Sequence, residues 1–158
     1  MPLNNPFRHL DGYNCFGCSP DNPSGLQLKF EIEGDEVVCV WHPQPNFQGW
    51  MNVLHGGIQA TMMDEIASWF IFVKLNTAGV TSKMEVRLMK TAHMDKGPYT
   101  MRARLQEMRR NIALIAVTLS DVTGTKVAES VMHYFTWPEE IAREKLFYPG
   151  VKEFGEEK

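Results

Sequence analysis

The sequence predicts an α+β fold in which a curved antiparallel sheet wraps around one long central helix. The order of the elements supports it, because two strand patterns precede a single long helical pattern and four strand patterns follow. The helical pattern over residues 58–75 is apolar at almost every helical phase, which is typical of a helix buried on all sides. A single curved sheet covers only part of such a helix, so a second subunit or the N-terminal leader must cover the rest.

Composition narrows the class of protein. The chain has 158 residues, of which 44% are hydrophobic, and we expect a single domain over residues 1–158. The net charge of −3 includes no basic run, which argues against nucleic-acid binding. We expect a cytoplasmic protein without membrane contact, because no signal peptide is apparent and Asp64 and Glu65 interrupt the apolar helix. Three cysteines fit reduced thiols better than a disulfide framework.

The elements before and including the helix follow from local patterns. Residues 1–25 are rich in Asn, Pro and Gly and predict a mostly irregular leader. Apolar and polar residues alternate over 26–33, which predicts a strand with one buried face, and a turn leads into a second strand at 37–41. Prolines end that strand, and an irregular crossing leads to a helix over about 55–76.

Four more strands are expected after the helix, because turn signals separate four alternating segments. We expect them at 80–89, 98–108, 112–122 and 126–137. The alternation in the first two indicates half-exposed antiparallel strands. Pro138 can start a short helix that runs to about Leu146, and a charged tail follows, so the core is expected over 26–137 and the C-terminal helix and tail over 138–158.

The start of the long helix, His55-Gly56-Gly57, carries the first chemical signal. Two glycines let the backbone approach a ligand closely, while the unpaired N–H groups and the helix dipole favour a developing negative charge. That suits a thioester or ester carbonyl that becomes an oxyanion, although the glycines also fit a mere tight turn. His55 is either an acid–base group or, as is more usual at a helix entrance, a residue that orients the loop.

Asp64 lies nine residues after His55. At about 100° per residue the two fall on opposite sides of a continuous helix, so one chain does not bring them into one site. If both serve one reaction, the simplest geometry is a twofold dimer in which the helix start of one subunit faces Asp64 of the other. A buried acid can also pair with an arginine or cap a backbone group, and Glu65 competes with Asp64 for any catalytic role.

The segment from His55 to Asp64, with Phe47-Gln48-Gly49 before it, resembles the signature of hotdog-fold acyl-CoA thioesterases of the phenylacetate-thioesterase (PaaI-like) group. The resemblance covers about residues 14–137 and includes the leader motif Cys15-Phe16-Gly17-Cys18. In that family a curved antiparallel sheet surrounds a long helix, and subunits join their sheets edge to edge. It implies hydrolysis of an acyl-CoA, or a related acyl thioester, to the free acid and CoA at a dimer-interface site, in a homodimer or a homotetramer.

Roles for single residues come from the same resemblance. It implies that the Gly56 amide polarises the thioester carbonyl and that Asp64 of the partner subunit acts as general base or nucleophile. Thr81 matches a Ser or Thr that positions the attacking water, although it also fits an ordinary β-branched strand residue. The chain departs from the pattern at Gly49, where some relatives have an Asn that helps to hold the carbonyl. Candidates to replace that Asn are Asn46, Gln48 and Asn52.

Cys15 and Cys18 form a Cys-x-x-Cys pair that could be half of a zinc site. A structural zinc site needs four ligands, and Cys39 and His42 would complete it only by coincidence of folding. We therefore expect no metal site and no cofactor. The pair lacks the βαβ context of thiol oxidoreductases, and the simpler interpretation is that it packs the leader over the sheet.

Arg102 and Arg104 point the same way on the strand at 98–108, and Arg109 and Arg110 lie at the following turn. These arginines could meet the phosphates of CoA, although a solvated strand face also explains them. The expected substrate-binding residues are Gly57, Gln48, Glu65, Arg109 and Arg110.

Two other functions stay open. A hydratase or dehydratase of the same fold would use a His with an Asp or Glu, and a non-catalytic acyl or CoA binder would keep the pocket without hydrolysis.

Overall fold

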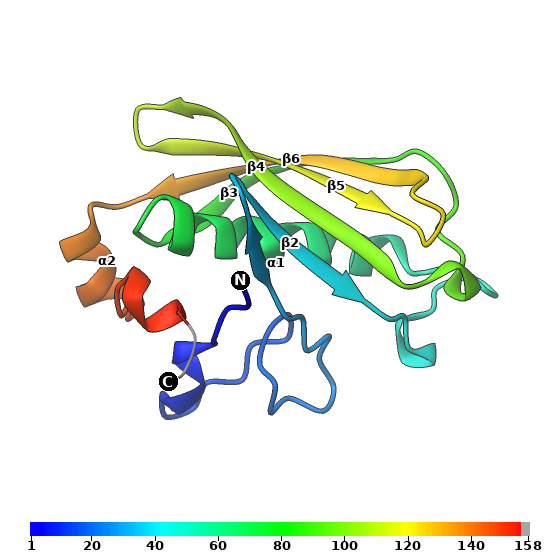
Figure 1. Cartoon of the computed structure of the whole chain (residues 1–158), viewed down its shortest axis with the longest axis horizontal. Coiled ribbons are helices and arrows are strands. Elements are labelled where there is room, and N and C mark those ends of the chain that lie inside the picture. The colour runs from blue at the N-terminus through cyan, green and yellow to red at the C-terminus, as the bar shows by residue number, and fades with distance from the viewer. Residues whose placement is uncertain (156–158) are drawn as a thin grey trace.

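The computed structural model describes residues 1–155, in which six strands and two α-helices form the framework. The elements are β1 (Glu31–Glu33), β2 (Glu36–Trp41), α1 (Gly56–Lys74), β3 (Gly79–Leu88), β4 (Tyr99–Arg109), β5 (Ile112–Ser120), β6 (Lys126–Thr136) and α2 (Glu139–Leu146). Short 3-10 helices occur at Pro6–His9, Pro45–Phe47, Met94–Lys96 and Val151–Phe154. The strands form one antiparallel sheet in the order β1-β2-β4-β5-β6-β3, which curves around α1 (Figure 1). The predicted fold is confirmed.

Helix α1 is long because its sequence offers no proline and no interior break between its N-cap, His55, and Leu75. Its sheet side is fully buried, and the leader and the C-terminal segment cover part of the other side. Phe7 of the leader lies 5.2 Å from Phe72, and Phe154 lies 5.5 Å from Trp69, measured between ring centroids. Among residues 1–155 no helix combines the length and the hydropathy that crossing a membrane requires.

The strand predicted at 26–33 is paired only over Glu31–Glu33, so the prediction of its start is wrong. The alternation is real, because Leu26, Leu28 and Phe30 are buried. The backbone of this segment, however, bonds to the leader. Leu26 N–H donates to Phe16 O and Leu28 N–H to Gly17 O, at 2.8 and 2.9 Å, and Gln27 between them has a φ of 52°. The leader therefore takes the place of a neighbouring strand.

Strand β3 forms one edge of the sheet and pairs with β6 alone. The prediction that it is half-buried is wrong, because it lies at the sheet margin and is exposed over most of its length. Its apolar side chains Val80, Met84 and Leu88 are 45%, 51% and 53% exposed. A long edge strand with exposed apolar side chains and unpaired backbone groups is a template for pairing with another chain.

Candidate functional site

The start of α1 is held by His55, whose Nδ1 accepts a hydrogen bond from the Gly57 N–H at 2.9 Å. The ring is thus fixed as an N-cap, which satisfies one of the free amides of the first turn. Gly56 is the first helical residue, so its own N–H has no intrahelical acceptor. This free amide, next to the positive end of the helix dipole, is a donor to a developing negative charge.

The loop before α1 packs closely against this helix start. A Cβ on Gly49 would lie 3.1 Å from His55 Cα, so this position, at which the sequence departs from the family pattern, is tightly packed. Gln48, one of the candidates to replace the Asn of the family pattern, already makes a hydrogen bond within the loop, because its Oε1 accepts from the Asn52 N–H at 3.1 Å.

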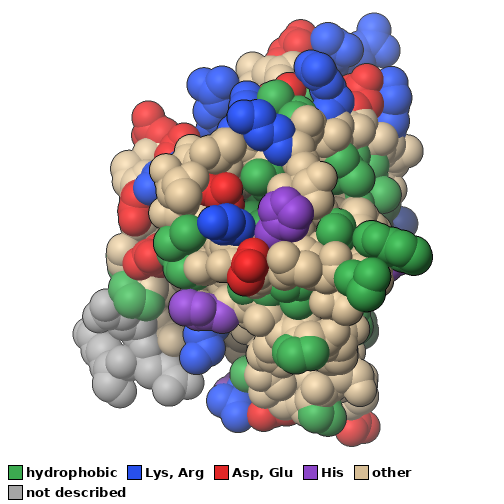
Figure 2. Space-filling view, turned by 90° about the vertical axis from the view of Figure 1, so that its right-hand side faces the viewer, with side chains coloured by type: hydrophobic (Ala, Val, Ile, Leu, Met, Phe, Trp, Pro, Cys, Tyr) green, Lys and Arg blue, Asp and Glu red, His purple; other side chains and the backbone are tan. Residues whose placement is uncertain are grey.

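The same loop carries Trp50 and Met51, which are 76% and 73% exposed. Figure 2 views the end of the molecule at which α1 starts and shows hydrophobic side chains interspersed with charged ones. The surface around the helix start therefore offers apolar contacts to a ligand or to a second chain.

Asp64 lies on the side of α1 that faces β3 and β6, where two hydroxyl groups hold its carboxylate. Thr81 Oγ1 donates to Asp64 Oδ1 at 2.8 Å, and Tyr134 OH donates to the same oxygen at 2.7 Å and to the Asp64 backbone carbonyl at 2.8 Å. Within residues 1–155 no donor reaches the other oxygen, Oδ2. The carboxylate is therefore oriented through one oxygen, and the second remains available to accept a proton.

Tyr134 is a site residue that sequence reasoning missed. It faces Thr81 across the β3–β6 ladder, and the register shifts directly after Thr81, where Ser82 Oγ donates to His133 O at 3.1 Å. Burial raises the pKa of Tyr134 well above its usual value, so the phenol stays protonated and donates. In the sequence it is one of the alternating inward residues of the last strand, and nothing distinguishes it from core.

We expect Tyr134→Phe to lower the free energy of unfolding by about 1–3 kcal/mol, because the Asp64 carboxylate loses a buried hydroxyl donor. Thr81→Val removes the second donor, but because Thr81 lies on an exposed strand, we expect it to lower the free energy of unfolding by less. Urea denaturation followed by circular dichroism measures both. Equal losses of stability in the two variants would contradict the dominant role of the buried hydroxyl.

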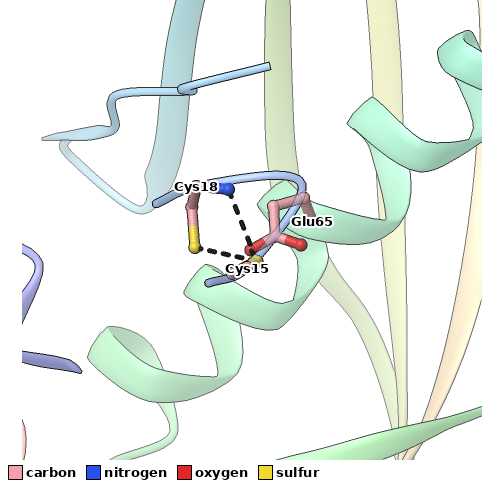
Figure 3. Close-up of side chains that lie close together, drawn as sticks. All are labelled: Cys15, Cys18 and Glu65. Carbon is pink, nitrogen blue, oxygen red and sulfur yellow. Dashed lines mark hydrogen bonds between the residues drawn. The ribbon is translucent and has the colours of Figure 1, made fainter. Parts of the chain in front are cut away.

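Glu65 turns away from Asp64 and toward the leader. Its Oε1 lies 3.4 Å from Cys15 Sγ, which in turn lies 3.4 Å from Cys18 Sγ (Figure 3). Burial raises the pKa of Glu65 to about 8, and the hydrogen bond from the Cys18 thiol lowers the pKa of Cys15 to about 5. Asp64 and Glu65 are adjacent in α1 but lie in different environments, because Asp64 contacts β3 and β6 whereas Glu65 contacts the leader.

An open apolar groove of about 340 Å³ adjoins Glu65. It runs between the leader, α1 and the segment after α2. Its lining includes Phe7, Leu10, Phe72, Leu146, Phe147 and Gly79. Its size and apolar walls suit a small hydrophobic group.

Arg109 and Arg110 lie at the tip of the β4–β5 hairpin. Arg109 pairs with Glu107 at 3.0 Å, and Arg110 forms the turn with a φ of 55°. The hairpin lies at the opposite end of the molecule from the start of α1 (Figure 1). Within one chain the structure therefore joins Thr81 to Asp64 but brings neither arginine to the helix start.

Part of the chain is similar to a known family of proteins. The family model of the thioesterase superfamily matches residues 51–128, which include the start of α1, Asp64 and Thr81. A search of curated protein sequences finds no significant match. The match spans 78 of the 158 residues, so the chain is similar to the thioesterase superfamily over about half of its length, and its curved antiparallel sheet around α1 has the hotdog architecture.

Solved structures show the same fold. A Streptococcus mutans protein bound to acetyl-CoA has a TM-score of 0.65 and 16% identity, over 83% of this chain and 98% of that one. A zebrafish thioesterase superfamily member 2 has a TM-score of 0.64 and 22% identity, over 73% and 89%. A hypothetical thioesterase from Streptococcus pneumoniae with coenzyme A has a TM-score of 0.62 and 19% identity, over 70% and 90%.

Proposed function

We propose that this protein is a thioesterase that hydrolyses an acyl-CoA, or a related acyl thioester, to the free acid and the thiol, as in the PaaI-like group. The observation that carries the proposal is the Asp64 carboxylate, which Thr81 and Tyr134 orient through Oδ1 while Oδ2 stays free. A base fixed in this way can take a proton from water. The thioesterase family match and the solved relatives with CoA compounds support the choice of substrate.

The Gly56 amide and the Asp64 carboxylate are too far apart in one chain to serve one carbonyl. They lie eight positions apart in α1, which corresponds to about 12 Å along the helix axis. A base and an oxyanion donor must both lie about 3 Å from the atoms they serve around one reacting carbon. We therefore assign the two groups of each site to different subunits of a homodimer.

The exposed edge of β3 offers a way to bring them together. Antiparallel pairing of two β3 strands around a twofold axis places the start of one strand beside the end of the other. Thr81 lies near the start of β3 and bonds Asp64, whereas Leu88 ends β3 next to Gly56, whose added Cβ would lie 2.9 Å from Leu88 Cδ1. Such a dimer has two sites, each built from Asp64 of one subunit and Gly56 of the other.

The reaction then proceeds in two steps. Asp64 Oδ2 accepts a proton from a water molecule, whose oxygen forms a bond to the thioester carbon while the carbonyl oxygen becomes negative. The Gly56 N–H and the helix dipole stabilise that oxyanion. Collapse of the intermediate breaks the C–S bond, and the leaving thiolate takes the proton that Asp64 accepted from water, which returns Asp64 to its carboxylate form. The apolar groove beside Glu65 can receive the acyl group, while His55 keeps the helix start in place through its bond to Gly57.

A panel of acyl-CoAs tests the proposal directly. Released CoA is measured with a thiol reagent over short, long and aryl acyl groups, and we expect turnover of at least one class. Absence of release across the panel contradicts the proposal. Tight binding without release would indicate a non-catalytic binder, and a change in enoyl absorbance with a 3-hydroxyacyl substrate would indicate a dehydratase instead.

A further inference from the structure

Cys15, Cys18 and Glu65 form a cluster of three metal-ligating side chains that lines the groove beside α1 and includes neither Asp64 nor Gly56. Their two sulfur atoms and one carboxylate oxygen all lie within 4.8 Å of one another. The Cys15–Cys18 and Cys15–Glu65 contacts are both 3.4 Å long. In Figure 3 the leader loop lies across α1, and the thiol of Cys15 and the Glu65 carboxyl meet between them. Residues 50 positions apart in the sequence thus present their ligand atoms to a common point.

The loop that carries the cysteines is built around this cluster. A Cβ on Gly17, the second of the two residues between the cysteines, would lie 2.5 Å from Glu65 Oε2, so a glycine at this position leaves room for the carboxylate to approach. The Cys18 N–H donates to Cys15 Sγ at 3.4 Å, the kind of backbone bond that stabilises a thiolate. Two bonds from the following segment, to Phe16 O and Gly17 O, anchor the loop.

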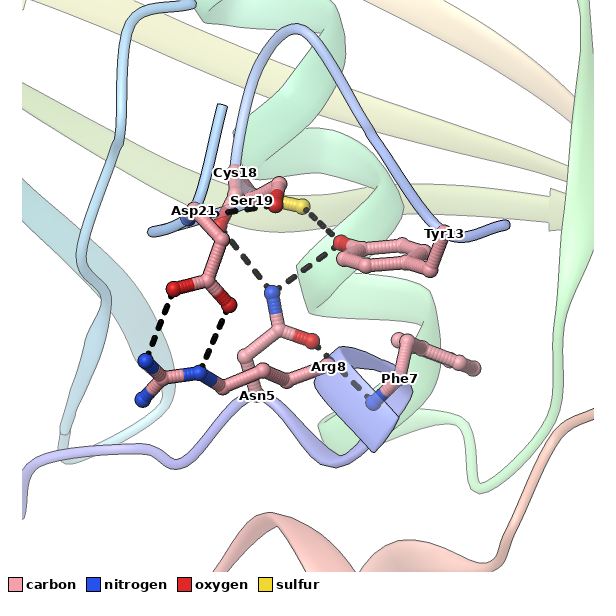
Figure 4. A network of polar contacts seen from close by, with 7 residues as sticks. All are labelled: Asn5, Phe7, Arg8, Tyr13, Cys18, Ser19 and Asp21. Carbon is pink, nitrogen blue, oxygen red and sulfur yellow. Dashed lines mark hydrogen bonds and ion pairs between the residues drawn. The ribbon is translucent and has the colours of Figure 1, made fainter. Parts of the chain in front are cut away.

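A second network holds Cys18 from the other side (Figure 4). Asn5 Nδ2 donates to Cys18 O and to Tyr13 OH, each at 3.0 Å, and Tyr13 OH lies 3.0 Å from Cys18 Sγ. The ligand atoms are therefore positioned by contacts that do not involve a metal, which lowers the cost of binding one.

The spacing and the chemistry of these atoms fit one class of cation. Tetrahedral zinc, with Zn–S bonds of about 2.3 Å and Zn–O bonds of about 2.0–2.2 Å, places its ligand atoms roughly 3.6–3.8 Å apart, within a few tenths of an ångström of the two 3.4 Å contacts that Cys15 makes. Two sulfur ligands disfavour Mg²⁺ and Ca²⁺, which prefer oxygen alone. Lys, Arg and His are missing from the lining of the adjoining groove, so a divalent cation would supply the positive charge.

We propose that Cys15, Cys18 and Glu65 bind a thiophilic divalent cation of the Zn²⁺ class, with the fourth coordination position open to water in the adjoining groove. The cation joins the leader to α1 one residue away from Asp64. Cys39 and His42, the further ligands that the sequence suggests, are not part of this cluster. A glutamate on a distant helix is a ligand that spacing along the sequence does not reveal.

Titration with Co²⁺, a spectroscopic substitute for Zn²⁺, tests this proposal on the full chain after reduction and chelator treatment. We expect one equivalent to bind with thiolate-to-cobalt charge-transfer absorption, and Zn²⁺ to displace it. Cys15→Ser and Glu65→Gln should each weaken binding at least about tenfold. Cys39→Ala removes a buried thiol outside the cluster and is the matched control, which should bind as the wild type does.

Added Zn²⁺ should also raise the melting temperature of the wild type and of Cys39→Ala, but not that of Cys15→Ser. Circular dichroism verifies that each variant is folded before metal is added. Absence of charge-transfer absorption in the reduced wild type overturns the proposal, as does equal binding by wild type and Cys15→Ser. Recovery of only a Cys15–Cys18 disulfide, with no metal uptake after its reduction, overturns it as well. None of these readouts depends on hydrolysis.

Discussion

Asp64→Asn is expected to lower kcat for acyl-CoA hydrolysis by about 10²–10⁴-fold without unfolding the protein. The asparagine carbonyl oxygen can replace Oδ1 as the acceptor for the hydroxyls of Thr81 and Tyr134. The amide group that replaces Oδ2, in contrast, cannot take a proton from water. Steady-state CoA release measures the loss, and circular dichroism verifies the fold.

The matched control for this variant is Asp35→Asn, which makes the same change on the exposed turn between β1 and β2 and should leave kcat unchanged. One pair of activities would contradict the assignment of Asp64 as the base. If Asp64→Asn keeps its activity while Glu65→Gln is inactive, the proton acceptor is Glu65, and the assignment of the two acids is wrong.

Gly56→Pro is expected to lower kcat by about 10²–10³-fold, the usual effect of removing one oxyanion donor. Proline lacks the N–H that we assign to the oxyanion, yet it suits the first position of a helix. His55, which would precede it, has a φ of −54° and a ψ of 130°, a conformation that a following proline permits. The added ring meets the end of the Leu88 side chain, which is 53% exposed and free to move.

Gly56→Ala separates the loss of the amide from the added bulk. It introduces the same Cβ next to Leu88 but keeps the N–H, so it should lose far less activity than Gly56→Pro. Similar losses in the two variants would show that the space at Gly56, and not its amide, is what the reaction needs.

The main framework of this fold could be predicted from the sequence because its signals are local. The all-round apolar pattern of α1 and the alternation along β2, β4, β5 and β6 match the elements to within a few residues. The exposure of β3 could not be predicted, because strand order depends on contacts between distant segments and an edge strand can carry the same alternation as a central one. For the same reason Leu26 and Leu28 were expected to lie in a strand, whereas they bond to the leader.

Some residues of the candidate site could likewise be predicted from the sequence, and others could not. The helical phase alone predicts that His55 and Asp64 lie on opposite sides of α1. The family resemblance singles out Thr81, and in the structure Thr81 donates a hydrogen bond to the Asp64 carboxylate. Tyr134 and the approach of Glu65 to Cys15 depend on which side chains meet across the fold. Each of these residues has an ordinary local explanation, a core tyrosine or an acid on a helix, so only its neighbours reveal it.

The division of the site between two subunits is tested most directly by a heterodimer of two inactive variants. Co-expression of Asp64→Asn and Gly56→Pro chains with different affinity tags allows the mixed dimer to be purified. If Gly56 and Asp64 come from different subunits, one of its two sites is intact, and the mixed dimer should have about half of the wild-type activity. If both groups come from one chain, every site carries a lesion, and activity no higher than that of the parent variants would contradict the account.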